Sequence, residues 1–313
     1  MIKKCVSINI LNYNTFEKTK KCIDSCLKQK GVTYQILLID NNSSDDSLNQ
    51  LYDIYGDTIS YLKNIDNFGY AKGNNLGVAY SKDNGYTYSL LLNSDTELSG
   101  DFLLKSLVDI IESYRDCAIV APTIYNVTNR GNILHHNDSI YHKLLRFARI
   151  LPHKKFLSNK IESISEAYGS AMLVDNKCFL SLGGFPEHYF MYGEESTFAK
   201  KTLWSHKLIL WSIDNDNFVL HHHDTTKKME NWRNFLRGRN RGLEFYENYK
   251  DHNPLLWSLV YKIYGIISWI RGYKTGDYTY YEGLKRAKIL SDSNQSNYEK
   301  FLEAKKVREE FKT

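Results

Sequence analysis

One stretch of the chain decides its fold, Leu90-Leu91-Leu92-Asn93-Ser94-Asp95-Thr96-Glu97. Three consecutive leucines are typical of a strand that is buried on both faces of a sheet. The run ends on Asn, Ser and Asp, which favour turns and carry oxygen atoms that can coordinate a cation. In an α/β sheet the ligand crevice lies outside the carboxyl ends of the strands. We therefore interpret Asp95 as a ligand for Mg²⁺ or Mn²⁺, which would hold a diphosphate; the alternative is a simple turn.

The segments before this stretch alternate between predicted strands and predicted helices. Thr15 is a candidate N-cap for the first helix. Alternation at this spacing indicates βαβ units, and hence an α/β fold with a mostly parallel central sheet flanked by helices. The predicted strands are 5–11, 34–39, 59–63 and a fourth that ends at residue 95, and the predicted helices are 15–29, 48–55 and 71–81.

The predicted strand ends bring Asn12, Asp40 and Asp95 to one edge of the sheet. Asp40 is either a helix-capping turn residue or an acceptor for a nucleotide base or ribose. No glycine-rich phosphate loop follows the first strand, which disfavours a dinucleotide-binding dehydrogenase and a P-loop enzyme.

The second half of the chain holds two further candidates. Glu194 and Glu195 precede a helix predicted over residues 196–205, where the helix dipole favours acidic residues; one of them could equally be a general base. The run His221-His222-His223 follows a predicted strand and is either structural or contains a metal ligand. Residues from about 126 to 165 are expected to be irregular and basic, as a substrate loop or a poorly ordered excursion.

Composition limits the class of protein. The chain has 313 residues, 42% of them hydrophobic and 25% charged, which is the balance of an ordinary globular protein. A net charge of +5 is too small to indicate a nucleic-acid-binding protein. The five cysteines form no CxxC pair, and we expect reduced thiols in a cytoplasmic protein. The N-terminus lacks the apolar region of a signal peptide, and no apolar run reaches the roughly 20 residues of a membrane span.

We expect one domain over residues 1–250 and a helical region over residues 251–313. The helix predicted over residues 255–271 carries one narrow polar stripe on a wide apolar surface. Residues 254–271 should lie on the inner face of the membrane as a peripheral contact, pack on the protein body, or form a homo-oligomer contact. The tail after residue 294 is charged and is expected to be a solvated helix.

Five motifs, in order, carry a family resemblance. They are VSINILNYN (6–14), LIDNNSSDDS (38–47), NFGYAKGNNLG (67–77), LNSDTE (92–97), and GGF with FMYGEE (183–195). Over roughly residues 4–250 the chain resembles the inverting nucleotide-sugar glycosyltransferases of family 2, which have the GT-A fold. It is most similar to their bacterial rhamnosyltransferase-like branch.

The resemblance implies a set of site residues. Glu195, where the family usually has aspartate, would be the catalytic base, and Glu194 is the alternative. The metal ligands would be Asp95 with His221 or His223, and Asn93 stands where the family's D-x-D motif has its first aspartate. The residues implied for nucleotide-sugar binding are Asn12, Asn14, Asp40, Asn42, Asn67, Gly69, Lys72, Asn75, Asn93, Ser94 and Asp95.

The resemblance also implies a reaction. A Mn²⁺- or Mg²⁺-dependent enzyme would move a hexosyl or rhamnosyl-type unit, with inversion, from a UDP- or dTDP-linked sugar to a saccharide acceptor on lipid or protein. Its setting would be the synthesis of bacterial surface polysaccharide or of a glycoprotein glycan. Two alternatives stay open. A sugar-phosphate nucleotidyltransferase would need a Gly-rich loop with Arg and Lys after the first strand, where this chain has Asn12-Tyr13-Asn14-Thr15. A non-catalytic scaffold of the same fold is motivated by Asn93 and Glu195.

Overall fold

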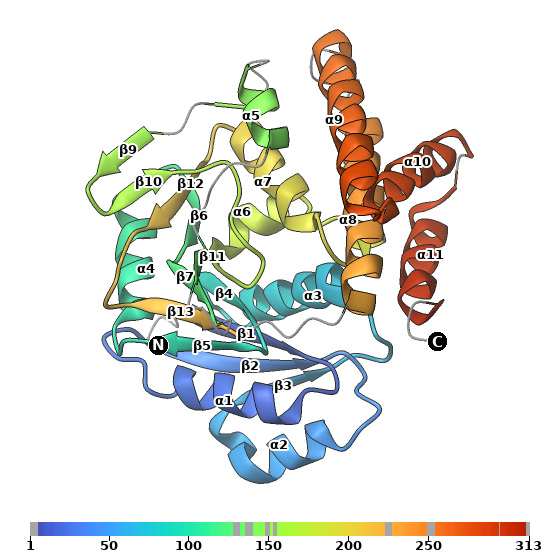
Figure 1. Ribbon diagram of the computed structural model, residues 1–313. Helices are drawn as coiled ribbons and strands as arrows, with labels where there is room; N and C mark the ends of the chain where they lie inside the picture. Colours follow the sequence, from blue (N-terminus) through green and yellow to red (C-terminus); the bar gives the residue numbers. More distant parts are fainter. Residues whose placement is uncertain are drawn as a thin grey trace. The chain divides into compact units, whose positions relative to one another are not determined.

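The computed structural model describes residues 6–127, 132–134, 140–147, 151–152, 155–222, 227–248, 254–293 and 295–310 (Figure 1). The chain forms two compact units, each described separately below. The first unit comprises residues 1–136, 154–185 and 198–223, and the second comprises residues 137–153, 186–197 and 224–313.

A large sheet forms the centre of the first unit, with strand order β3-β2-β1-β4-β11-β6-β12-β10-β9. The first four of these strands are parallel, as the alternating pattern predicted, whereas β11 runs antiparallel to both β4 and β6. The sheet is therefore mixed beyond β4. Its strands are β1 (Val6–Asn12), β2 (Tyr34–Asp40), β3 (Ser60–Lys63), β4 (Tyr88–Asn93), β6 (Cys117–Ala121), β9 (Lys155–Ser158), β10 (Ile161–Ser163), β11 (Ala171–Asp175) and β12 (Leu208–Ser212).

A second sheet of the same unit has the order β5-β13-β7-β8. Its strands are β5 (Thr96–Ser99), β7 (Ile124–Asn126), β8 (Asn132–Leu134) and β13 (Phe218–His221). This sheet matters for function because β5 begins immediately after Asp95, so that its partner β13 brings His221 alongside that turn.

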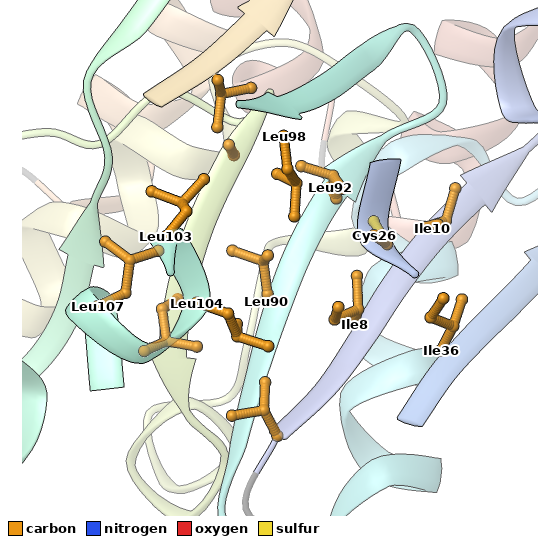
Figure 2. Packing of buried hydrophobic residues seen from close by; sticks show 14 of the residues in the cluster. Ile8, Ile10, Cys26, Ile36, Leu90, Leu92, Leu98, Leu103, Leu104 and Leu107 are labelled. Atoms are coloured by element: carbon orange, nitrogen blue, oxygen red, sulfur yellow. The ribbon is translucent and has the colours of Figure 1, made fainter. Parts of the chain in front are cut away.

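Apolar side chains cover both faces of β4, as its leucine run predicted. Leu90 and Leu92 join one core cluster together with Cys26 of α1 (Phe16–Cys26), as Figure 2 shows. The same cluster contains Cys22, while Leu91 joins a separate cluster on the other face. Helices therefore flank the sheet on two sides, which confirms the predicted α/β architecture. The helices of this unit are α1 (Phe16–Cys26), α2 (Ser47–Tyr55), η1 (Gly56–Thr58), α3 (Gly69–Asp83), α4 (Leu103–Ser113), α6 (Asn176–Ser181) and the part of α7 (Glu194–Trp204) from Phe198 onward.

The expectation of an irregular segment from about residue 126 to residue 165 was wrong for the described residues. The segment contributes β8, β9, β10 and a helix. Strand β10 pairs antiparallel with β12 and so extends the large sheet. The pattern was missed because three- and four-residue strands are too short to show a clear alternation of apolar and polar residues.

The second unit is helical. It contains α5 (Ile140–Phe147), η2 (Glu187–Tyr189), the first residues of α7 (Glu194–Trp204), α8 (Lys227–Asn248), α9 (Pro254–Thr275), α10 (Thr279–Asp292) and α11 (Asn297–Glu310). The tail was expected to be a solvated helix, and only the helix was correct. Phe301, Ala304 and Val307 of α11 are buried, and this helix packs against η2.

Small residues let α8 and α10 approach closely. A Cβ atom on Gly238 would lie 2.0 Å from the carbonyl oxygen of Tyr280, and one on Gly283 would lie 2.2 Å from that of Phe235. One turn further along each helix, a Cβ atom on Gly242 would lie 2.4 Å from the Cβ atom of Ala287. The backbones of the two helices are therefore in direct contact at this crossing.

We expect Gly283→Ala to destabilise the protein, because the added methyl group meets backbone atoms that cannot rotate away. The loss of unfolding free energy should be about 1–3 kcal/mol. Gly265→Ala in α9 is the matched control, since no atom lies within 4 Å of its added methyl group. Alanine is the better helix former, so the control should gain about 0.5–1 kcal/mol. Urea unfolding of both variants is the measurement, and equal midpoints would contradict the crossing.

Candidate functional site

The ends of β1 and β2 are joined by the side chain of Asn12, which is fully buried. Its amide nitrogen donates to Asp40 Oδ1 at 2.8 Å and lies 3.1 Å from Ser43 Oγ and 3.2 Å from Ser47 Oγ. Parallel pairing in register places Asn12 directly beside Asp40. The chain direction of two parallel strands thus delivers both polar residues to one edge, where they organise the turn that leads into α2.

Asp40 is almost completely buried, and both of its carboxylate oxygens accept hydrogen bonds from within the protein. Oδ1 accepts from Asn12 and from the Ser43 hydroxyl, and Oδ2 accepts from the Ser43 backbone N–H at 3.0 Å. Asp40 therefore shapes the turn at the edge of the sheet. Its contact with a nucleoside stays a prediction.

Thr15 connects this edge to the Asn93-Ser94-Asp95 turn. It occupies the N-cap position of α1, as predicted, but its hydroxyl makes no capping bond. The hydroxyl instead donates to Asn12 Oδ1 at 3.0 Å and lies 3.2 Å from Ser94 Oγ. A chain of hydrogen bonds accordingly runs from Asp40 through Asn12 and Thr15 to Ser94.

Other residues implied for nucleotide-sugar binding surround the same edge. Asn14 is exposed, and its Oδ1 accepts from the backbone N–H of Ser44 at 2.8 Å. Asn42 is also exposed, and both asparagines have positive φ, at 56° and 60°. Asparagine tolerates this backbone conformation better than most residues, so these two positions first meet the needs of the turns.

The segment around the start of α3 is fixed by its own polar groups. Asn67 Oδ1 accepts from the backbone N–H of Gly69 at 3.0 Å. Lys72 Nζ lies 4.2 Å from the centre of the Phe68 ring. Asn75 forms two hydrogen bonds with the backbone of Phe185, each 2.9 Å long: its Nδ2 donates to the carbonyl oxygen, and its Oδ1 accepts from the N–H. Asn75 therefore holds the turn after α6, and a role for it in donor binding stays a prediction.

Sequence reasoning missed Asn41 in this region. Its amide nitrogen donates to the carbonyl of Gly69 at 2.9 Å, and its Oδ1 accepts from Asn64 at 2.8 Å. The side chain is buried, so it links the end of β2 to the start of α3. Two adjacent asparagines in the turn gave the signal, but the sequence alone does not say which of them points inward.

Asp95 forms a pair with His221, since Nε2 of the histidine lies 3.3 Å from Asp95 Oδ1. The pairing of β13 with β5 explains this, because His221 lies opposite Thr96, the residue after Asp95. Burial alone would raise the pKa of Asp95, but the hydrogen bond and charge of His221, together with the charge of Lys18 and a backbone hydrogen bond, outweigh it and lower that pKa. The neighbouring pair, His222 Nε2 and Glu97 Oε1, is 2.7 Å apart. His223 lies outside the described residues.

These side chains fit a hard divalent cation. Asp95 offers a carboxylate, and Asn93 and Ser94 in the same turn are only partly buried, so oxygen ligands face accessible space. His221 adds an imidazole next to the carboxylate. Within the described part of the chain, no three His, Cys, Asp or Glu side chains form a metal cluster. Backbone, amide, hydroxyl or ligand oxygens would therefore have to complete the coordination.

The second unit holds the carboxylate pair at the start of α7. Glu194 is buried, and this burial raises its pKa well above the ordinary value, with the charge of Glu195 raising it further. Glu195 is only partly buried, and its Oε2 accepts from the backbone N–H of Gly193 at 3.1 Å. The two adjacent residues thus have different environments, and Glu195 is the one that solvent can reach.

Arginines of α8 lie around this pair within the second unit. The guanidinium carbon of Arg237 is 5.1 Å from the centre of the Tyr192 ring, and its charge acts to lower the pKa of Glu194. Arg241 Nη1 is 2.7 Å from both Ser196 Oγ and Glu244 Oε2. Arg241 is therefore engaged in internal bonds, while the side chain of Arg237 is exposed.

Comparison with known proteins identifies relatives of this chain. The family model described as "Glycosyl transferase family 2" matches residues 7–179, more than half of the 313 residues. The low-salt glycan biosynthesis hexosyltransferase Agl10 of Haloferax volcanii is 30% identical over 195 residues, which cover 62% of this chain and 60% of Agl10. Chondroitin synthase of Pasteurella multocida is 29% identical over 41% of this chain and 13% of its own length.

Solved structures show the same fold. GalNAc-T7 with UDP, GalNAc and Mn²⁺ aligns with a TM-score of 0.61 at 14% identity, over 96% of this chain and 56% of that one. The mannosyltransferase PcManGT of Pyrobaculum calidifontis, with GDP-Man and Mn²⁺, aligns at 0.57 and 12% identity over 93% and 76%. S. aureus TarS 1-349 with UDP-GlcNAc aligns at 0.54 and 16% identity over 77% and 66%.

These matches agree with the resemblance drawn from the five motifs, and they confirm its coarser content. The family model covers the edge of the sheet that carries Asn12, Asp40 and Asp95. The chain belongs to glycosyl transferase family 2, and its fold is of the GT-A type.

Proposed function

We propose that this protein transfers a hexosyl unit from a nucleoside-diphosphate sugar to an acceptor hydroxyl, with inversion at the anomeric carbon. One observation carries the proposal: the hydrogen-bond chain from Asp40 to Ser94, which ends beside the pair of Asp95 and His221. A nucleoside diphosphate has a polar base and sugar at one end and a doubly charged group at the other. The edge offers polar groups and a candidate cation site in the same order.

The proposed class of donor is supported by the ligands bound in solved structures of similar fold. Solved neighbours were crystallised with UDP, UDP-GlcNAc or GDP-Man, and we propose a nucleotide sugar of this kind, UDP- or dTDP-linked, for this chain. Asn14 and Asn42 are exposed beside the buried Asn12 and Asp40, so their side chains are the ones that a base or ribose would meet. A nucleotide-linked rhamnosyl-type sugar is one of the donors to be included in the activity test described below.

We propose that Asp95 and His221 hold a Mn²⁺ or Mg²⁺ ion in the loaded enzyme. Such an ion neutralises the charge that develops on a leaving diphosphate. Asn93 can still offer its carbonyl oxygen, but it lacks the negative charge of the family's usual aspartate. The side chain of Lys18 also acts electrostatically on Asp95, which brings a positive charge to the same turn.

We propose Glu195 as the general base that takes the proton from the acceptor hydroxyl. A base must be ionised and within reach of its substrate, and Glu195 is the partly exposed member of the pair. Glu194 is buried with a raised pKa, so it is poorly suited to hold a negative charge that an acceptor can reach. As Glu195 takes this proton, the acceptor oxygen attacks the anomeric carbon, and the bond from that carbon to the nucleoside diphosphate breaks in the same displacement.

The acceptor is proposed to be a saccharide carried on lipid, at the inner face of the membrane. Among the described helices, none is long and apolar enough to cross a bilayer. Helix α9 nevertheless exposes an apolar stripe, formed by Leu255, Leu259, Ile266, Trp269 and Tyr273. Successive members are three or four residues apart, except between Leu259 and Ile266, where the exposed Lys262 takes the intervening position. Residues 254–276 contain Lys262, Arg271 and Lys274 but no acidic residue. An apolar and aromatic face with only positive charge matches an anionic lipid surface.

The function is tested by incubating the protein with a panel of nucleotide sugars and measuring released nucleoside diphosphate. Turnover of at least one donor is expected. A pure scaffold would release none, and a sugar-phosphate nucleotidyltransferase would instead form pyrophosphate from a nucleoside triphosphate.

The matched pair Glu195→Gln and Glu194→Gln tests the base. Glu195→Gln should lower kcat for transfer by about 10²–10⁴-fold, the usual contribution of a general base, with donor affinity retained. Glu194→Gln should keep most of the activity. Loss of transfer in Glu194→Gln, with activity retained in Glu195→Gln, would move the base to position 194.

Glu194→Gln should also change the pH dependence of stability. The folded pKa of Glu194 is raised, so the folded protein keeps a proton that the unfolded chain releases above about pH 4.3. The unfolding free energy of the wild type therefore falls as pH rises above that value. The variant lacks this loss, and its advantage in Tm over the wild type should be larger at pH 8 than at pH 4.

Removal of divalent cations should abolish transfer, because the carboxylate of Asp95, whose pKa is lowered, and a diphosphate are both negatively charged and need a cation between them. Turnover is measured in excess EDTA and again after addition of Mn²⁺. Asp95→Asn should raise the Mn²⁺ concentration needed for half-maximal rate by at least about tenfold, because even the loss of a group that only supports a metal ligand costs about 10–100-fold in affinity. Unchanged turnover in EDTA would assign the diphosphate to basic side chains alone.

The combined variant Leu259→Ser, Ile266→Ser and Trp269→Ser tests the stripe on α9, since all three side chains are exposed. We expect it to stop co-sedimenting with anionic lipid vesicles while its donor turnover is unchanged. Ile289→Ser removes an exposed apolar side chain of α10 and serves as the control. If the wild type does not bind vesicles but forms an oligomer that the variant loses, the stripe is a subunit contact.

A further inference from the structure

The loop that leads to the proposed base contains a strained turn. Phe190 has φ 65° and ψ −59°, and the N–H of Met191 donates to the carbonyl of Tyr189 at 2.8 Å. Together these define a γ-turn of the rare type with positive φ. Tyr192 and Gly193 follow with φ values of 71° and 91°. For residues other than glycine, such conformations cost of order 1–3 kcal/mol each and persist only where other contacts hold them.

One side chain of α8 supplies those contacts. Asn240 is fully buried, and its amide nitrogen lies 3.2 Å from the carbonyl oxygen of Tyr189, 3.0 Å from that of Met191 and 2.7 Å from that of Tyr192. An amide group has two N–H donors, so the three carbonyl oxygens share these two donors. Asn240 thereby binds the loop at three backbone positions that bracket the strained turn, while the side chains of Tyr189 and Tyr192 make further contacts.

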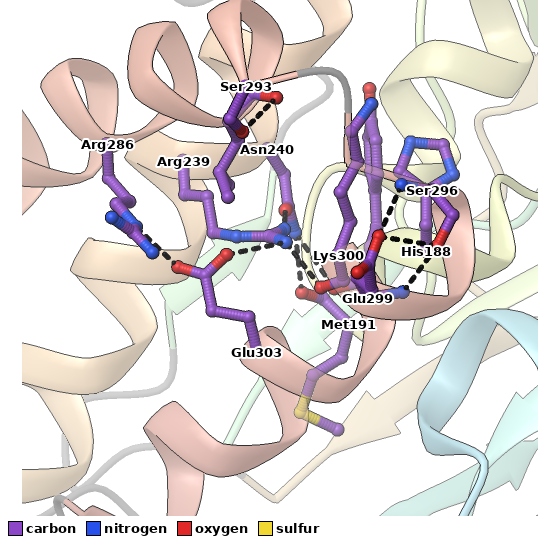
Figure 3. A network of polar contacts seen from close by, with 12 residues as sticks. His188, Met191, Arg239, Asn240, Arg286, Ser293, Ser296, Glu299, Lys300 and Glu303 are labelled. Atoms are coloured by element: carbon purple, nitrogen blue, oxygen red, sulfur yellow. Dashed lines mark hydrogen bonds and ion pairs between the residues drawn. The ribbon is translucent and has the colours of Figure 1, made fainter.

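Asn240 is in turn held by Arg239 and α11 (Figure 3). Arg239 is fully buried, donates from Nη1 to Asn240 Oδ1 at 2.6 Å and from Nη2 to the carbonyl of Lys300 at 2.5 Å, and lies 3.6 Å from Glu303 Oε2. The ring of Phe301 packs edge-on against that of Phe190 at 5.8 Å. Helix α11 therefore contacts the loop directly through Phe301, and it contacts Asn240 indirectly through Arg239.

We propose that Asn240 is a positioning residue for the acceptor base, an inference that rests on the proposed function. It fixes the backbone of residues 189–192 so that Gly193 and Glu195 follow in a defined direction. Released from Asn240, the strained turn relaxes and the carboxylate of Glu195 loses its alignment. Misalignment of a reacting group by about 1 Å costs up to about a hundredfold in rate. Replacing Asn240 changes no residue of the proposed donor-binding edge in the first unit. The rate of transfer should therefore fall, while the affinity for the donor should not change.

Asn240→Asp is the test, because it keeps the shape of the side chain and removes both donors. Asn248→Asp is the matched control on the same helix, since the amide of Asn248 donates to the carbonyl of Glu244 within α8. We expect Asn240→Asp to lower kcat for transfer by about 10–100-fold with the Kd for UDP and Mn²⁺ within about twofold of the wild type. The control should match the wild type in both. A kcat within twofold of the wild type would overturn the proposal, as would a Kd that rises in step with the fall in kcat.

A second readout does not depend on activity. The N–H of Met191 is protected by the γ-turn, so hydrogen–deuterium exchange of peptides covering residues 186–197 should accelerate in Asn240→Asp and stay unchanged in Asn248→Asp. Unchanged exchange would overturn the proposal even if kcat fell. If the wild type turns over no donor, the proposed function fails while exchange still decides whether Asn240 holds the loop. Should Asn240→Asp not fold, Asn240→Ser keeps one donor, and smaller changes of the same sign are expected.

Discussion

The buried amide of Asn12 is the interaction on which the proposed donor-binding edge of the large sheet depends. Asn12 is the last residue of β1, and its side chain forms hydrogen bonds with Asp40 at the end of β2 and with Thr15 and Thr19 at the start of α1. A buried amide that lost these partners would cost roughly 1–3 kcal/mol per unsatisfied group, so the elements are held in one arrangement. Parallel strands bring polar residues to the same edge, and Asn12 converts that proximity into fixed geometry.

The loop that carries the proposed base depends on a different kind of constraint. The backbone near Phe190 is strained, and buried polar groups of α8 and α11 compensate for it. Close packing of α8 on α10 through Gly238 and Gly283 holds Arg239 and Asn240 in place, because glycine leaves room for direct backbone contact. Strain of this kind is common at functional sites, where it fixes a reactive group in a direction that an unstrained loop would not keep. The helical region is therefore part of the catalytic architecture that we propose, in addition to carrying the exposed stripe of α9.

Much of the fold could be predicted from sequence because the signals were local. The leucine run of β4 and the alternation of strands and helices up to Asp95 define the parallel half of the sheet. The antiparallel direction of β11 and the short strands after residue 126 were not predicted, since pairing direction and three-residue strands leave no periodic signal. The buried face of α11 was also missed, because many charged residues obscured three apolar ones.

The candidate site was predictable in its residue types but not in its contacts. Asn12, Asp40 and Asp95 were found from strand ends, whereas the link through Thr15 and the inward turn of Asn41 required three-dimensional structure. Asn75 shows the opposite case, since it matches a motif and yet both its amide atoms bind the backbone of Phe185. The proposed reaction is a single displacement assisted by Glu195. The most direct measurement is the anomeric configuration of the transfer product by proton NMR, with a donor of known configuration. A single displacement gives the product the configuration opposite to that of the donor, and retention of the donor configuration would contradict it.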